Sequence, residues 1–178
     1  MAQVVRKVLS PFIIFLFLST TTFAQKQTFA ELLALAKKGE AWAQNEVGLA
    51  YSWGGTSTGE RVRPNSKRAI YWLKKSAEKG LPLGACNLGY HYGIGRGVTK
   101  NLVMMVKWVS IGEVLDPLRC GSEAAVRLKP STCERDVGWQ MAHEWLKAHP
   151  DLKNNFKQQP WLSDPVEDLS PKCKQKRR

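Results

Sequence analysis

The sequence lacks the residue patterns of the common catalytic and metal sites. It has no Cys-x-x-Cys pair and no histidine at ligand spacing from a cysteine, so we expect no metal site and no cofactor. The three histidines, His91, His143 and His149, have no Ser, Cys or Asp at a spacing typical of a catalytic pair. The glycine-rich run 93–97 lacks the Gly-Lys-Ser/Thr ending of a phosphate-binding loop and is predicted to be a turn. These absences argue against an enzyme.

Beyond the N-terminus, no segment is long and apolar enough to span a membrane, which takes about 20 residues. At the N-terminus, Arg6 and Lys7 precede a short apolar stretch over residues 8–18. Thr22-Phe23-Ala24 then offers the small–x–small pattern that signal peptidase accepts. This order predicts a cleaved signal peptide over residues 1–24 and export to the periplasm. The residue directly after the cleavage site is Gln25 and not a cysteine, so we do not expect a lipid anchor.

Acidic residues are also few, because 15 Asp and Glu stand against 27 Lys and Arg, for a net charge of +12. Removing the signal peptide with its two basic residues leaves about +10. In an exported protein this excess does not indicate nucleic acid. It points to an acidic protein partner or to anionic lipid or cell-wall polymer, and a merely soluble basic surface is the alternative.

The segment 151–178 is basic and poor in apolar residues, so we expect a loosely ordered C-terminal tail. Trp161 and Leu162 are the exception, because they offer apolar surface that would pin the tail to the domain.

An internal repeat organises the intervening domain, residues 25–150. Residue pairs 36 positions apart are Val62/Val98, Asn65/Asn101 and Trp72/Trp108. Upstream the offset becomes 41, from Gly48 to Gly89, so the first unit carries a five-residue insertion within residues 53–60. A weaker third copy carries Trp145. A repeat of this length predicts helix pairs that stack and share one core.

Each unit is expected to form two helices, A and B. In the second unit these are predicted over residues 83–92 and 102–114, with glycines in the turn between them. Asn65 and Asn101 stand where a side-chain oxygen caps helix B, and Gly80 ends the first helix B. Helices over residues 28–38 and 132–148 would cover the two ends of the stack.

Gly48 and Gly89 recur at the same place in helix A. Glycine within a helix costs about 1 kcal/mol relative to alanine. The recurrence therefore predicts that the backbones of neighbouring helices pack closely at this position.

These residues resemble the Sel1-like repeat family, a relative of the tetratricopeptide repeats. The matching residues of the second unit are Leu88-Gly89, Tyr92, Gly95-Arg96-Gly97-Val98 and Trp108. Those of the first unit are Ala43, Val47-Gly48, Tyr51, Gly59, Val62, Ala69 and Trp72. The resemblance covers about residues 28–150, strongly as far as residue 114. It implies an all-α fold, a short α-solenoid of antiparallel helix pairs with two clear repeats and a degenerate third, and A helices that line its concave side.

Four cysteines in an exported chain predict disulfides, and the candidates are Cys86, Cys120, Cys133 and Cys173. We expect Cys86–Cys120, because both lie on A helices that stack side by side, together with Cys133–Cys173, because the tail could reach back to Cys133. Cys120–Cys133 stays open if the third helix A starts late or breaks at Gly121. If that helix is intact, Cys120 lies at its start and Cys133 lies beyond its far end. The two cysteines are then more than about 7 Å apart, which is too far for a disulfide.

The tryptophans divide into two groups. Trp72, Trp108 and Trp145 recur with the repeat, as core residues do, whereas Trp42 and Trp53 do not recur. Exposed tryptophans often anchor a partner, so these two are candidate contacts, with core packing as the alternative. The predicted partner-binding residues are Trp42, Asn45, Glu46, Asn87 and His91 on the A helices, and Trp53, Glu60 and Arg61 in the insertion.

The leading functional prediction is a periplasmic protein-binding scaffold or adaptor. The resemblance also implies an alternative within that class, an immunity protein that neutralises a delivered antibacterial toxin such as a lipase effector. A second alternative, also implied by the resemblance, is a β-lactam-binding or hydrolysing enzyme, which needs an activated serine nucleophile that we do not expect here. A further alternative is binding of an anionic envelope surface through the tail.

Overall fold

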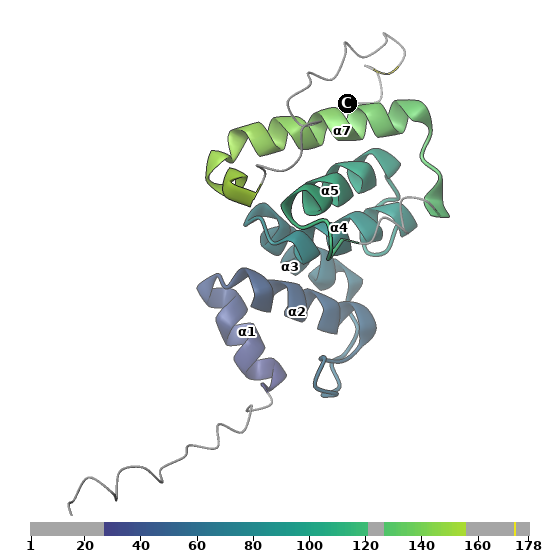
Figure 1. The fold of residues 1–178 in the computed structure, drawn as a ribbon. Helices are drawn as coiled ribbons and strands as arrows, with labels where there is room; N and C mark the ends of the chain where they lie inside the picture. Colours follow the sequence, from purple (N-terminus) through teal and green to yellow (C-terminus); the bar gives the residue numbers. More distant parts are fainter. Residues whose placement is uncertain (1–26, 121–126, 156–172, 174–178) are drawn as a thin grey trace, which may run out of the picture.

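The computed structural model describes residues 27–120, 127–155 and 173, and within them the fold is all-α (Figure 1). The predicted signal peptide, Trp161, Leu162 and most of the third helix A lie outside these residues. The helices are α1 (Phe29–Lys38), α2 (Ala41–Trp53), α3 (Ser66–Glu78), α4 (Pro82–Ile94), α5 (Leu102–Leu115), α7 (Thr132–Ala148) and the 3-10 helix η2 (Pro150–Asn155). None of the helices in the described part has the length and apolar character needed to cross a bilayer.

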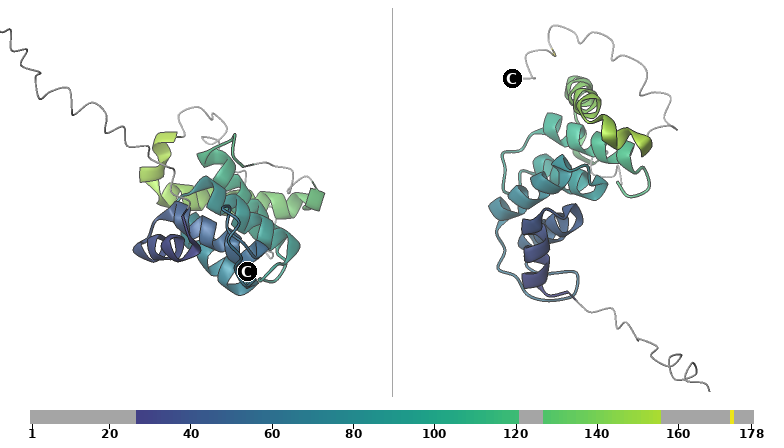
Figure 2. Two further views of the ribbon diagram at one scale, coloured as in Figure 1. Left: turned by 90° about the horizontal axis from the view of Figure 1, so that it is seen from below. Right: turned by 90° about the vertical axis from the view of Figure 1, so that its left-hand side faces the viewer.

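The helices stack in chain order, with α1 and α2 at one end and α7 at the other (Figures 1 and 2). The first unit is the pair α2 and α3, and the second is the pair α4 and α5. Each helix packs against the next one, and α2 also contacts α4. The predicted short α-solenoid is therefore confirmed.

The helix ends follow the predicted local chemistry. Asn65 and Asn101 cap α3 and α5, because their Oδ1 atoms accept from Arg68 N at 3.0 Å and from Met104 N at 2.9 Å. Thr28 begins α1 with a capping box, in which the Glu31 carboxylate accepts from Thr28 N at 2.8 Å. These contacts satisfy backbone donors that a helix start leaves without partners.

Gly48 and Gly89 pack as closely as their recurrence predicted. A Cβ on Gly48 would lie 2.8 Å from the Leu73 side chain, and one on Gly89 would lie 3.0 Å from Met105 O and 3.1 Å from Val109 N. Glycine at these positions lets each A helix approach its B helix.

Two of the recurring tryptophans are buried, Trp72 at 9% and Trp108 at 4% exposure. Trp145 is half-buried, and its ring centroid lies 5.9 Å from that of Trp108. All three belong to or pack against the hydrophobic core.

Two disulfides are present, Cys86–Cys120 and Cys133–Cys173, with Cα–Cα distances of 5.7 and 5.2 Å. The alternative pair Cys120–Cys133 does not form. The 3-10 helix η2 follows α7 and extends from Pro150 to Asn155. Leu152 packs there against the core, beside Gly80.

Candidate functional site

A pocket of about 630 Å³, which we call the A-helix pocket, opens beside α2 and the start of α4. Its walls are more apolar than polar. They consist of Gln27, Leu32, Trp42, Asn45, Glu46, Ser57, Thr58, Leu81, Leu83 and Arg119. Three of the predicted partner-binding residues, Trp42, Asn45 and Glu46, therefore lie together here.

Trp42 is the largest apolar side chain that remains open in this pocket, with 41% of its surface exposed. It shares one face of α2 with Asn45 and Glu46, because residues three and four positions apart are neighbours on a helix. Two tryptophans of the repeat, Trp72 and Trp108, are at most 9% exposed. Trp42 therefore retains apolar surface that a partner could bury.

Asn45 connects the two A helices beneath the pocket. Its Oδ1 accepts from Asn87 Nδ2 of α4 at 2.9 Å, and its own Nδ2 donates to Glu46 Oε1 at 3.3 Å. Asn45 is only 2% exposed. It therefore links α2 to α4 and contacts Glu46, and its role as a partner contact stays a prediction.

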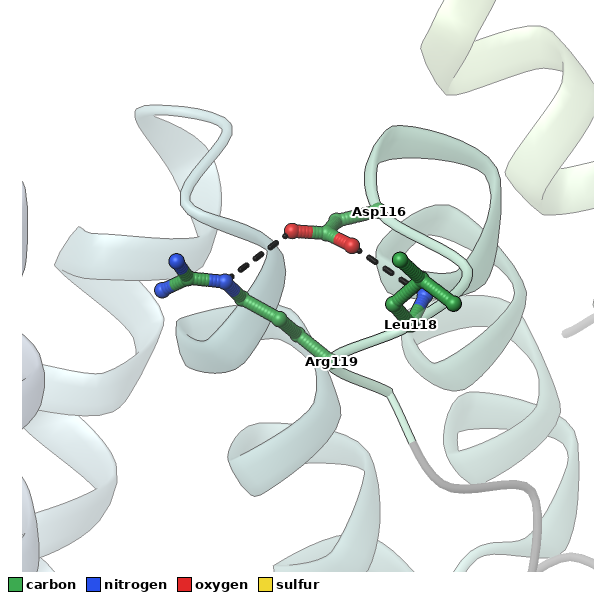
Figure 3. Close-up of polar contacts among 3 residues, drawn as sticks. All are labelled: Asp116, Leu118 and Arg119. Atoms are coloured by element: carbon green, nitrogen blue, oxygen red, sulfur yellow. Dashed lines mark hydrogen bonds and ion pairs between the residues drawn. The ribbon is translucent and has the colours of Figure 1, made fainter.

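Arg119 is a charged pocket residue that the sequence pattern did not indicate. It lies in the loop after α5, where its Nε atom pairs with Asp116 Oδ2 at 3.2 Å (Figure 3). Asp116 Oδ1 also accepts from Leu118 N at 3.1 Å, which holds the turn (Figure 3). The next residue, Cys120, is joined to Cys86 of α4. The disulfide therefore fixes the loop beside α4 and places a cation in a pocket that also contains Glu46.

His91 is not available to a partner, because it is only 1% exposed. Its Nε2 lies 3.1 Å from Ser52 Oγ and its Nδ1 lies 2.9 Å from Arg96 O. Burial lowers the pKa of His91, which favours the neutral ring. Ser52 is equally buried, at 1%, so this serine–histidine pair joins the two units and cannot reach a substrate.

Two residues of the insertion, Ser57 and Thr58, line the A-helix pocket. The predicted contact residues Trp53, Glu60 and Arg61 are not among its lining residues. Trp53 is 60% exposed, and the Arg96 guanidinium lies 4.6 Å from its ring centroid. The Glu60 carboxylate accepts from Phe29 N at 2.6 Å, which ties the insertion to the start of α1. Arg61 lines a different pocket.

One Ser-x-x-Lys spacing, which some serine enzymes that react with β-lactams use, occurs at Ser76 and Lys79. The environment of Ser76 does not suit a nucleophile. Ser76 is fully buried, and its hydroxyl donates to Ala41 O at 2.7 Å. Residues 27–120, 127–155 and 173 also contain no cluster of side chains able to hold a metal ion.

Comparison with known proteins supports the repeat. A family model described as Sel1 repeat matches residues 43–81 and 82–108. The fold is similar to the crystal structure of a protective antigen present in uropathogenic Escherichia coli strains, which displays an SLR fold. That similarity has a TM-score of 0.63 and 24% identity and covers 75% of this chain and 29% of that one.

A second similar crystal structure is that of a Sel1 repeat protein from Oxalobacter formigenes, with a TM-score of 0.45 and 20% identity. That match covers 66% of this chain and 34% of the other. The chain thus spans about a third of the length of these structures. No curated protein matches it.

Proposed function

We propose that this chain, which carries two Sel1 repeats, is a periplasmic binding scaffold that holds a segment of a partner protein in the A-helix pocket. The observation that carries the proposal is Trp42, a 41%-exposed aromatic side chain in an apolar recess. Aromatic side chains in such recesses often supply much of the binding energy of an interface.

The lining indicates what kind of segment would fit. A volume of about 630 Å³ lies within the range of ligand pockets, and Trp42, Leu32, Leu81 and Leu83 offer an apolar side chain a place to bind. The Nη atoms of Arg119 would donate to an acidic group, because its Nε atom already pairs with Asp116. An acidic partner also suits the net charge of about +10 that remains without the predicted signal peptide, because opposite charge speeds encounter.

Two observations support the periplasm. The pattern of residues 1–24 is that of a secretory signal, and both disulfides suit an oxidising compartment. We propose no catalytic role, since the serines of the two arrangements that resemble catalytic ones, Ser52 and Ser76, are buried.

Affinity capture from a periplasmic extract, at physiological salt and without reductant, tests this proposal. The tagged protein should retain a partner that Trp42→Ala loses. Tyr71→Ala is the matched control, because Tyr71 is 54% exposed on α3 and outside the pocket. Equal capture by wild type and Trp42→Ala would rule out the A-helix pocket as the binding site.

A further inference from the structure

A second pocket, of about 590 Å³, lies between the start of α1, the end of α2 and the start of α3. Its walls include Arg61, Arg63, Arg68, Phe29 and Tyr51, and we call it the arginine pocket. Tyr51 follows Trp42 by nine positions, or two and a half helical turns, so the two side chains point to opposite sides of α2. The arginine pocket is therefore separate from the A-helix pocket.

The scaffold of this pocket is well defined. Arg68 Nη1 donates to Tyr51 Oη at 3.3 Å, and its guanidinium carbon lies 5.5 Å from the centroid of the Tyr51 ring. The backbones of Arg61 and Gly55 form an isolated antiparallel β-bridge. Two more backbone hydrogen bonds hold residues 61–65 against the end of α2. Val62 N donates to Gly54 O at 3.0 Å, and Asn65 N donates to Tyr51 O at 2.8 Å.

The charges of the three arginines are not neutralised within the described part of the chain, where Arg61, Arg63 and Arg68 form no ion pair. The carboxylates of Glu60 and Glu31 bind backbone donors at the start of α1 and keep their charge, but in the described part of the chain they pair with none of the three arginines. Glu60 accepts from Phe29 N, and Glu31 accepts from Thr28 N. All three arginine side chains are exposed and line one recess, so they concentrate positive charge where an anion could bind.

We infer that the arginine pocket binds the carboxylates of an acidic peptide segment. A guanidinium group presents paired N–H donors that match the two oxygens of a carboxylate. Phe29, Tyr51 and Val62 add an apolar wall on which a neighbouring side chain of the same segment can pack. A recess with both features suits a peptide side chain better than the flat surface of a bilayer.

The test is fluorescence anisotropy with a labelled peptide that carries three carboxylates around one phenylalanine. Its control peptide has Asn and Gln in place of Asp and Glu. We expect R61Q/R63Q/R68Q to weaken binding of the acidic peptide about tenfold or more. The double variant R61Q/R63Q, which leaves the Arg68–Tyr51 contact intact, should show a smaller loss in the same direction, and circular dichroism checks that both variants are folded.

The matched charge control is K37Q/K38Q/K100Q, which removes three exposed cations away from the pocket. It should change affinity less than about threefold, because it removes only long-range attraction. An equal loss in both triple variants would overturn the inference, and so would equal binding of the amide peptide. Displacement of the peptide by millimolar inorganic phosphate would also overturn it, by indicating a phosphate site. None of these variants touches Trp42, so the result is independent of the A-helix pocket.

Discussion

Replacing Cys86 and Cys120 by alanine tests whether their disulfide both stabilises the fold and builds the A-helix pocket. The bond closes a loop with a sequence separation of 34 residues. The bond restricts the unfolded chain, and for a loop of this length the lost entropy stabilises the folded state by about 4 kcal/mol. For a domain of this size that is a fall in Tm of about 10 °C or more.

The second disulfide is an internal control, because Cys133–Cys173 closes a loop of similar length, with a separation of 40 residues. C133A/C173A should therefore lose about the same stability, again about 4 kcal/mol. Only C86A/C120A releases the loop that carries Arg119, so only this variant should lose partner capture at a temperature where both variants are folded.

Urea unfolding followed by circular dichroism gives the stabilities, and capture from a periplasmic extract gives the binding. Loss of capture by both variants, or by neither, would refute the link between the disulfide and the pocket. A loss of stability far below 4 kcal/mol in both would refute the loop-entropy reasoning.

Three further predictions concern the repeat itself. Gly89→Ala should destabilise the fold by about 1–3 kcal/mol in chemical denaturation, because the new methyl meets Met105 O at 3.0 Å, whereas the change in an open helix would stabilise it. Asn101→Ala should cost about 1 kcal/mol through the lost cap, and an unchanged midpoint would contradict that role. Burial lowers the pKa of His91 below 6.5, so the unfolded chain binds its proton first as the pH falls. The contribution of His91 to the free energy of unfolding should therefore be complete above pH 6.5 and decline below it. His91→Gln should remove that part of the decline.

The sequence predicted those parts of the fold that depend on neighbouring residues. The cap at Asn101 and the proline at 150 mark helix ends locally, and the observed α5 and α7 agree with the predicted ranges to within one residue. The pattern set Trp42 apart from the recurring tryptophans but left core packing open, and the structure shows that 41% of its surface is exposed.

Other features depend on contacts between distant segments. Ser52 and His91 are 39 residues apart, and they meet only because α2 and α4 stack. Arg119 reaches the A-helix pocket through a loop held by a disulfide. Leu152 packs on the core although its segment is polar in sequence. No periodicity or motif in the sequence near these residues predicts such contacts.

Site-specific photocrosslinking tests the central claim most directly. A benzophenone amino acid is placed at position 42 in one variant and at position 71 in another, both in cells that produce the protein. Both positions are exposed and aromatic, but only position 42 lies in the A-helix pocket. We predict a discrete protein adduct from position 42 in the periplasmic fraction and none from position 71. No adduct from position 42, or the same adduct from both, would contradict the assignment of the A-helix pocket as the binding site.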